Sequence, residues 1–389
     1  MKRYAQETIY FAAAKRTPFG SFLGSLAGLT ATDLGHQAAK SALASINLDP
    51  GAIDHVIFGN VLQTAKDAIY LARHIGLRCE IPHRVPALGL NRLCGSGFEV
   101  VVQGARLLAN NEAQAVLVGG SESLSQAPHV IRGARSGIAL GHSKMEDSLW
   151  ECLHDTYVNL PMALTAEKLA ELYHINQEQV DNYALRSQML YFDALKQHKF
   201  LDELAPIQWL QYDEHPRLNT SLEALKKLPK VFKKDGVIHA AAASGICDGA
   251  AALIMCTESF IAKHQLKALG ELISFGISGC DPSIMGIGPV PAIKQCLAKA
   301  ELDLSDISMI EINEAFAPQV LAVQLELNLD INKLNIHGGA LAIGHPLAAS
   351  GARITTHLLH SLKNQPGALG LGSACIGGGQ GIAVLIRSI

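Results

Sequence analysis

Short apolar runs rich in β-branched residues alternate along the chain with windows in which apolar residues recur every three or four positions. The runs are 55–61 (HVIFGNV), 115–121 (AVLVGGS), 309–315 (MIEINEA) and 381–388 (GIAVLIRS). Each run predicts a buried strand, and the windows between them predict crossover helices. This alternation is typical of an α/β protein with a partly parallel sheet.

The first and last thirds of the chain resemble each other. The stretches NLDPGAIDHVIFGNVLQ and ELDLSDISMIEINEAFAPQ each read as a short helix followed by a strand. Asp54 precedes Cys94 by 40 residues in one third, and Asp306 precedes His345 by 39 residues in the other. The pattern predicts two duplicated units, with Cys94 and His345 at related points of their copies.

The pattern changes between the two thirds. Residues 164–200 read as two amphipathic helices, the second opening at Asn176 or Gln177. The stretch LAPIQWLQYDEHPRLNTSL that follows is rich in proline and mixed charge, which indicates an inserted subdomain that covers a ligand site. The predicted domains are a first core (1–120 plus 246–270), an inserted loop subdomain (121–245) and a second core (271–389).

Composition narrows the class of protein. The chain has 389 residues, of which 49% are hydrophobic and 17% charged, so it is long enough for several domains and lacks the signature of disorder. Its net charge of -3 argues against general nucleic-acid binding. The local cluster LKKLPKVFKKDG, residues 225–236, is either a solvated surface or a landing site for an anionic ligand.

Targeting and metal signals are weak. The N-terminal apolar run is too short for a signal peptide and is interrupted by Lys15 and Arg16, and no apolar stretch reaches the length of a membrane span. A cytoplasmic protein with no membrane partner is therefore expected. The 8 cysteines show no C-x-x-C pair, and His357 and His360 lack a third ligand, so neither a disulfide framework nor a metal site is predicted.

Two glycine-rich turns carry the first candidate groups. In NRLCGSGFEVVV, Cys94 stands at a tight turn that enters a helix, where the helix dipole would lower the pKa of the thiol. In IHGGALAIGHPLAASG, His345 stands just before a proline that can start a helix. Taken alone, Cys94 also fits a core cysteine and His345 a buried structural histidine.

Two further segments supply related chemistry. In GSACIGGGQG, Cys375 is followed by Gly377 and two more glycines whose backbone amides could form an anion-binding nest. In NEAFAP, Asn313 is expected at the end of a strand, where its neutral amide could hold a water or orient a ring nitrogen. A turn-capping asparagine is the alternative.

These four segments, together with AAAKRTPFGSF and GGSESLSQAP, closely resemble the thiolase family over essentially the whole chain. The resemblance implies the thiolase fold: two duplicated α/β core domains with an inserted loop subdomain. It also implies an acyltransferase that exchanges acyl units with coenzyme A as co-substrate, without a bound cofactor. Small residues would then leave room where four catalytic loops and two acyl thioesters meet.

The resemblance implies a role for each residue. Cys94 matches the acyl-accepting nucleophile, His345 the base that deprotonates it, and Cys375 the acid/base at the α-carbon of acetyl-CoA. Asn313 would hold a water that forms one oxyanion hole with His345, and the backbone amides of Cys94 and Gly377 would form the other. Claisen chemistry needs these two thiols and two anion sites.

The same resemblance implies where coenzyme A binds. Arg217 would reach its nucleotide end and Ser244 its pantetheine arm, with Phe316 and Met285 lining the acyl side. It further implies a homo-oligomer, dimer or tetramer, with the segment SQAPHVIRGARSG contributing to contacts between subunits.

Within the family, the chain is more similar to 3-ketoacyl-CoA thiolases of mitochondrial type than to dedicated acetoacetyl-CoA thiolases, because Pro161 replaces a histidine. Ala348 replaces a glycine, His337 an asparagine, and AAASG stands for GNASG, which affects pocket shape and chain-length preference. The competing hypotheses are a ketoacyl synthase, a non-catalytic CoA- or lipid-binding protein on this scaffold, and a Cys/His hydrolase. The second cysteine, Cys375, argues against each.

Overall fold

The computed structural model describes residues 7–138 and 140–389 of the chain. Its strands are β1 Ile9–Arg16, β2 Gly20–Ser21, β3 His55–Gly59, β4 Ala87–Leu90, β5 Ala115–Ser123, β6 His129–Val130, β7 Glu146–Asp147, β8 His154–Asp155, β9 Leu160–Pro161, β10 Cys247–Thr257, β11 Gly270–Gly279, β12 Met309–Ile312, β13 Leu369–Ile376 and β14 Gln380–Ser388. Its α-helices are α1 Ala31–Ser45, α2 Leu71–Arg78, α3 Ser96–Ala109, α4 Ser148–Cys152, α5 Met162–Leu172, α6 Gln177–Lys196, α7 Leu222–Leu225, α8 Glu258–His264, α9 Pro289–Ala300, α10 Ala317–Leu327, α11 Ala340–Ile343 and α12 Leu347–Leu362.

The α/β class is confirmed, and the four predicted runs form β3, β5, β12 and β14. Within the described residues, ten strands form one mixed sheet in the order β12-β13-β14-β11-β1-β10-β5-β3-β4, with β2 beside β10. A short antiparallel pairing of β1 with β11 joins the two halves of the sheet. The segment 1–6, part of the N-terminal stretch considered above, lies outside the described residues.

The duplication is visible in the strand register. In the first half β3 pairs parallel with β5 and places Gly59 opposite Gly120. In the second half β12 pairs parallel with β13 and places Ile312 opposite Ser373. The second strand of each pair then runs antiparallel to a long strand: β5 pairs with β10, and β13 pairs with β14. The two halves therefore repeat one α/β unit, as the sequence predicts.

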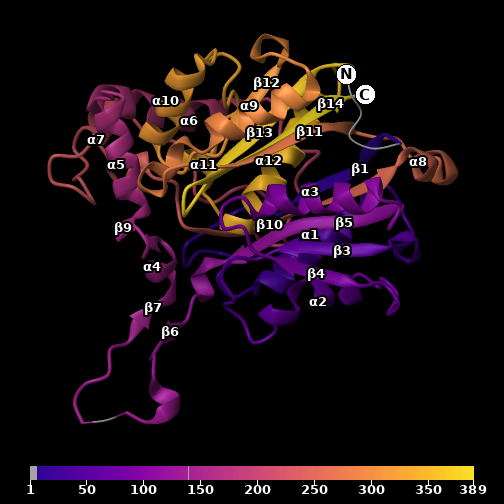
Figure 1. Ribbon diagram of the computed structural model, residues 1–389, viewed down its shortest axis with the longest axis horizontal. Helices are drawn as coiled ribbons and strands as arrows, with labels where there is room; N and C mark the ends of the chain where they lie inside the picture. Colours follow the sequence, from indigo (N-terminus) through magenta and orange to yellow (C-terminus); the bar gives the residue numbers. More distant parts are fainter. Residues whose placement is uncertain (1–6, 139) are drawn as a thin grey trace.

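The halves are stacked as layers around two central helices (Figure 1). Helix α3 contacts β3 and β5 of the first half, and α12 contacts β5, β10 and β13, so the two helices lie between the halves of the sheet. Helix α1 covers the outer face of the first half, and α9 covers the outer face of the second. Each half thus has an apolar core on both faces, as buried parallel strands require.

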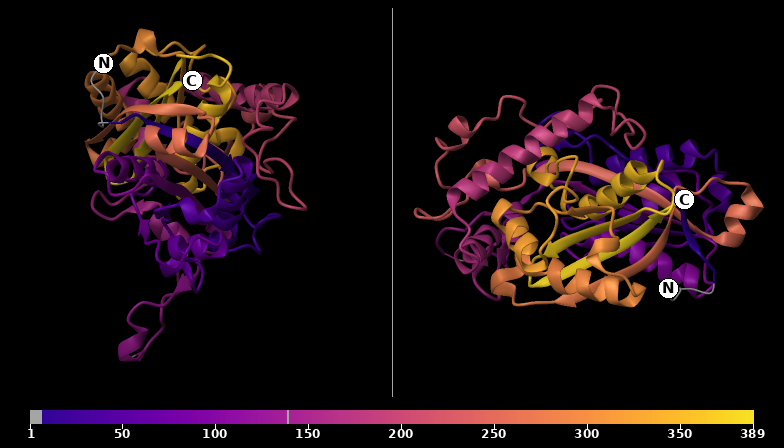
Figure 2. Two further views of the ribbon diagram at one scale, coloured as in Figure 1. Left: turned by 90° about the vertical axis from the view of Figure 1, so that its right-hand side faces the viewer. Right: turned by 90° about the horizontal axis from the view of Figure 1, so that it is seen from above.

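The inserted region contains two helices where they are predicted. Asn176 caps α6 through a capping box with Gln179, which fixes the start of the helix at the predicted point. Strands β6 and β7 form the base of an arm that projects away from the body of the molecule (Figures 1 and 2). Every helix among the described residues is too short or too polar to span a membrane.

Candidate active site

The Cys94 turn connects β4 to α3 under local strain. Leu93, the residue before the thiol, has φ of 48°, a left-handed conformation that is costly for a residue with a side chain. Ser96 stabilises the turn, because its hydroxyl donates to the Leu93 carbonyl at 2.7 Å and accepts from the Arg92 N–H at 2.8 Å. The strained turn holds Cys94, which is partly buried, at the N-terminal end of α3.

His345 lies at the matching point before α12. Its neighbour Gly344 has φ of 96°, and a Cβ there would come within 1.9 Å of the Cys247 sulfur, so only glycine fits. Pro346 is the N-cap residue of α12 rather than its first helical residue. The His345 N–H donates to the Gly245 carbonyl at 2.9 Å, which ties the histidine to the inserted region.

The two central helices bring Cys94 and His345 together by backbone contact. A Cβ on Gly97 of α3 would lie 2.4 Å from the Ala352 nitrogen and 2.7 Å from the Ala348 oxygen of α12. A Cβ on Gly351 would lie 2.4 Å from the Phe98 nitrogen. Gly97 and Gly351 therefore allow close packing of α3 and α12, and the expectation that small residues make room for substrate is wrong at these two positions.

The histidine ring is held in one tautomer. Ser350 Oγ donates to the Pro346 carbonyl at 3.1 Å and lies 2.5 Å from His345 Nδ1, so it accepts the Nδ1 proton. The Nε2 atom, which then carries a lone pair, lies 3.3 Å from the side-chain nitrogen of Asn313. Burial, helped by Arg353, lowers the pKa of His345 to about 3. The ring is thus neutral near pH 7 and able to accept a proton.

The second thiol lies close to the first. Cys375 is fully buried on β13, and the thiols of Cys94 and Cys280 are close enough that their charge would raise its pKa further, after burial has raised it. The Gly377 N–H, two residues on, is hydrogen-bonded to the Cys94 thiol. This contact joins the GSACIGGGQG segment to the Cys94 turn, as the sequence predicts.

The thiol of Cys94 differs from its predicted state. Burial raises its pKa to about 11, although the backbone N–H groups of Gly377 and of Cys94 itself lower it. The prediction of a lowered pKa is therefore wrong in direction, because removal of water outweighs the helix dipole and the local N–H groups. Cys94 needs a base to become a thiolate, and His345 is the neutral base on the same cavity.

Asn313 directly follows β12 and completes the polar group. Its side chain is fully buried, and its Oδ1 has no hydrogen-bond partner among the described residues. Its backbone N–H donates to the Ser373 carbonyl at 2.9 Å, which fixes it beside β13. The position at a strand end is the one predicted, and the contact with His345 favours a site role over a simple turn cap.

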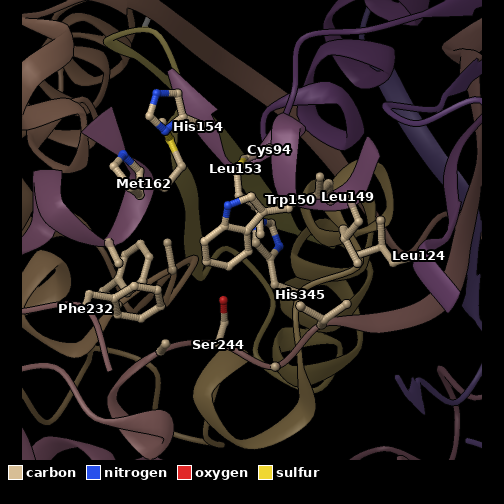
Figure 3. A pocket seen from close by; sticks show the side chains of 18 of the residues that line it. Cys94, Leu124, Leu149, Trp150, Leu153, His154, Met162, Phe232, Ser244 and His345 are labelled. Atoms are coloured by element: carbon tan, nitrogen blue, oxygen red, sulfur yellow. The ribbon is translucent and has the colours of Figure 1, made fainter. Parts of the chain in front are cut away.

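These groups surround a largely apolar cavity of about 180 Å³. Cys94, His345 and Ser244 project into the same space as Trp150 (Figure 3). The predicted acyl-side residues Phe316 and Met285 also line it, whereas Cys375 and Asn313 lie behind its wall. The cavity wall consists of Cys94, Leu124, Leu149, Trp150, Leu153, His154, Pro161, Met162, Ala163, Phe232, Ala243, Ser244, Gly245, Ile246, Met285, Ala315, Phe316, His345 and Leu347.

Two models of protein families match this chain: the thiolase N-terminal domain over residues 9–259 and the thiolase C-terminal domain over residues 266–388. The chain belongs to the thiolase family. Among curated relatives, it is 54% identical to the mitochondrial 3-ketoacyl-CoA thiolase of Homo sapiens, over 98% of each chain. It is 41% identical to an acetyl-CoA acetyltransferase of Pseudomonas aeruginosa, over 98% of this chain and 99% of the relative.

Solved thiolases share the fold. The human mitochondrial 3-ketoacyl-CoA thiolase superposes with a TM-score of 0.97 at 53% identity, covering 98% of this chain and 99% of that one. The same enzyme in complex with CoA gives a TM-score of 0.97 at 54% identity, over 98% of each chain. The predicted thiolase fold is therefore confirmed.

The expected cytoplasmic location is overturned by these relatives. The mammalian thiolases that share 50% to 54% identity with this chain are named mitochondrial enzymes. The sequence argument failed because a weak targeting signal does not specify a compartment. Composition cannot correct that error, since soluble enzymes of different aqueous compartments bury similar cores.

Some cavity residues of this thiolase carry no motif and were not predicted. Leu149, Trp150 and Leu153 come from or adjoin α4, and Phe232 comes from the lysine-rich segment. An apolar side chain has no chemical signature in a sequence, and the 58% exposure of Trp150 is known only from the structure. The sequence signal that could have found Trp150 is a large aromatic residue inside the predicted insert.

Arg217 lies apart from Cys94 and His345. Its backbone N–H donates to Gln188 Oε1 at 2.9 Å, and its side chain is exposed. It lines a separate surface hollow of about 330 Å³ with Leu225, Leu228 and Ala241. The structure thus brings Cys94, His345, Cys375, Asn313, Gly377, Ser244, Phe316 and Met285 together and places Arg217 elsewhere on the inserted region.

Proposed function

We propose that this protein is a 3-ketoacyl-CoA thiolase that cleaves 3-ketoacyl-CoA with coenzyme A, giving acetyl-CoA and a shortened acyl-CoA. The observation that carries the proposal is that Cys94 and the neutral imidazole of His345 line one apolar cavity, with the buried thiol of Cys375 close behind its wall. A hydrolase needs only one of the thiols, and a passive CoA-binding protein needs neither. The 54% identity to a named 3-ketoacyl-CoA thiolase supports the same choice.

In the first half-reaction Cys94 attacks the 3-keto carbon while His345 Nε2 takes the thiol proton. The bond between the α-carbon and the keto carbon then breaks, and its electron pair passes to the acetyl-CoA enolate. Cys375, neutral because burial raises its pKa, gives that carbon a proton. The products are acetyl-CoA and an acyl group bound to the Cys94 sulfur.

In the second half-reaction the thiol of coenzyme A attacks the acyl-Cys94 carbonyl. The proton that His345 took from Cys94 first passes to the Cys375 thiolate, which restores both groups. His345 then receives the proton of the coenzyme A thiol and gives it to the Cys94 sulfur as that sulfur leaves. The Gly377 N–H, which is hydrogen-bonded to the Cys94 sulfur, lies where a donor would stabilise the oxyanion of the acyl group. Asn313, through a water held beside His345, would stabilise the enolate oxygen.

A dedicated acetoacetyl-CoA thiolase is the second candidate. Acetyl-CoA acetyltransferases share 41% identity with this chain, against 50% to 54% for the 3-ketoacyl-CoA thiolases. The cavity walls also favour longer acyl chains, because Leu149, Trp150 and Leu153 add apolar surface beyond the catalytic group. Pro161 lies on this wall in place of a polar histidine.

We propose that coenzyme A enters across the inserted region. Ser244 faces the cavity for the pantetheine arm, while Arg217 borders the outer hollow for the nucleotide. The lysine-rich segment 225–236 adjoins this hollow through Leu225 and Leu228. Lys233 is paired with Glu171, and we propose that the exposed Lys226, Lys227 and Lys234 attract the phosphates.

We propose that the protein is a homo-oligomer that uses the projecting arm between Pro128 and Asp147. Ile131, Ile138, Leu140 and Met145 on this arm are all exposed by at least 46% of their surface, which is an aggregation hazard in a lone subunit. A dimer or a tetramer would cover them.

The decisive experiment measures thiolysis of acetoacetyl-CoA and longer 3-ketoacyl-CoA substrates with free coenzyme A. We expect turnover of short and medium chains. Turnover of acetoacetyl-CoA alone would select the second candidate, and no turnover by folded protein would reject both. The variant Cys94→Ser should fold but form no acyl-enzyme detectable by mass spectrometry, and full turnover in it would rule out Cys94 as the nucleophile.

A further inference from the structure

Glu122 lies near the end of β5 and is fully buried, yet no step above uses it. Its Oε1 accepts from the Asn60 side-chain amide and the Leu62 N–H, each at 3.0 Å. Its Oε2 accepts from the Val61 N–H at 3.2 Å and the Ala348 N–H at 3.0 Å. Four N–H donors therefore surround one carboxylate, which binds two separate segments of the chain.

One of these segments carries the catalytic histidine. Ala348 is in the first turn of α12, three residues after His345, where an anion is favoured by the helix dipole. The strand touches the same turn directly, because a Cβ on Gly120 would lie 1.8 Å from the Ala348 oxygen. Glu122 and Gly120 together fix the distance between β5 and the start of α12.

The other segment carries Asn60, the counterpart of Asn313 in the duplicated fold. Asn60 follows Gly59, which pairs with Gly120. Asn313 follows Ile312, which pairs with Ser373. Two residues beyond those partners the first half has Glu122 and the second half has Cys375. By strand register, Glu122 therefore occupies the position that the proton-transferring thiol occupies in the other half.

Glu122 also faces the nucleophile electrostatically. A negative charge on Glu122 is among the causes that raise the pKa of Cys94, although burial is the largest. The other ionisable groups that face Cys94 are Cys152 of α4, Cys375 of β13 and His345 before α12, and Glu122 itself also faces Asp248 of β10.

We propose that Glu122 is a positioning residue of the thiolase reaction: by binding residues 60–62 and the first turn of α12 at once, it holds His345 in place against Cys94. The inference rests on the proposed roles of Cys94 and His345. A neutral amide cannot replace the carboxylate, because each oxygen accepts from two N–H groups and an NH₂ would face two donors in either orientation.

The test compares E122Q with E203Q. Glu203 is also fully buried and binds Arg16 and His357, but His357 lies three turns along α12 from His345. In E122Q we expect kcat to fall about 100-fold, as a misplacement of about 1 Å at the reacting groups does, with an unchanged Michaelis constant for coenzyme A. We expect E203Q to lose stability without this selective loss of kcat.

The pH dependence of Cys94 alkylation by iodoacetamide is a second measurement, and a loss of stability alone does not change it. Burial raises the pKa of Glu122 to about 7, so it is anionic at the higher pH where Cys94 ionises. Loss of that charge in E122Q should shift the alkylation profile to lower pH, while E203Q and the charge-retaining E122D should keep the wild-type profile. E122D also serves if E122Q does not fold, with a smaller fall in kcat.

The proposal is overturned if kcat stays at the wild-type value in E122Q, or if E203Q shows the same fall in kcat and the same shift of the profile. Failure of the proposed function is distinguishable from this outcome. It would appear as absence of thiolysis in the wild-type protein, and the alkylation profiles would still report whether Glu122 acts on Cys94.

Discussion

The contact between α3 and α12 predicts that Gly97→Ala harms catalysis more than folding. The added Cβ would lie 2.4 Å from the Ala352 nitrogen, where ordinary contact begins at 3.4 Å, so the helices must separate by about 1 Å. Cys94 stands just before one helix and His345 just before the other. A displacement of that size at reacting groups lowers rates by about 100-fold.

The expected change in stability is smaller. Overpacking costs about 1 to 3 kcal/mol, whereas alanine is favoured over glycine in a helix by about 1 kcal/mol. The net decrease in the free energy of unfolding is therefore between nearly zero and about 2 kcal/mol. Catalysis is the larger effect, since a 100-fold loss corresponds to about 2.7 kcal/mol of transition-state stabilisation.

Thiolysis assays and urea unfolding of G97A should be compared with Gly28→Ala, because a Cβ on Gly28 meets nothing within 4 Å. We expect G28A to keep both activity and stability. Wild-type kcat/KM in G97A would refute the claim that backbone contact between the helices sets the distance between Cys94 and His345. An equal loss in G28A would show that the assay does not report on this contact.

Four further outcomes are expected. Cys375→Ser should still exchange acyl groups through Cys94 but lose carbon–carbon bond cleavage, and equal loss of both half-reactions would contradict the division of roles. Burial lowers the pKa of His345 from 6.5 to about 3. Between these two pH values the unfolded state binds a proton that the folded state does not, so the free energy of unfolding should fall as pH drops from about 6.5 toward 3. His345→Asn should flatten this dependence on pH in thermal melts. The Michaelis constant for coenzyme A should rise with salt if the lysines of segment 225–236 attract its phosphates, and a flat response rejects that role. Leu140→Asp should reduce the mass measured by light scattering, and a wild-type mass would exclude the arm from subunit contacts.

The sequence predicted the site residues that stand at turns. Cys94, His345, Cys375 and Asn313 stand at the ends of strands or the starts of helices, and their glycine and proline neighbours mark those positions. The strand ends of an α/β protein meet at one edge, so the positions imply a common site. The duplication was likewise readable, because the two copies keep similar spacing from the strand to Cys94 and to His345.

The sequence did not predict the properties that depend on burial in the folded structure. The direction of the Cys94 pKa depends on how much water the inserted region excludes, and that region is formed by apolar residues without a motif, such as Leu149 and Trp150. The role of the small residues failed for a similar reason. Glycine in a sequence does not say whether another backbone or a ligand fills the space beside it, and at Gly97 the neighbour is α12.

The duplicated fold explains why the two matching positions differ in chemistry. Glu122 is an anion when it binds its four N–H donors, and those donors come from residues 60–62 and from α12 of the other half. Cys375 sits at the same register position, fully buried. A thiol there stays neutral and keeps a proton that it can give to the α-carbon, whereas a second carboxylate beside Cys94 would add a charge that further opposes thiolate formation. In the proposed mechanism, one half of the repeat therefore supplies an anchor, Glu122, and the other supplies a proton donor, Cys375.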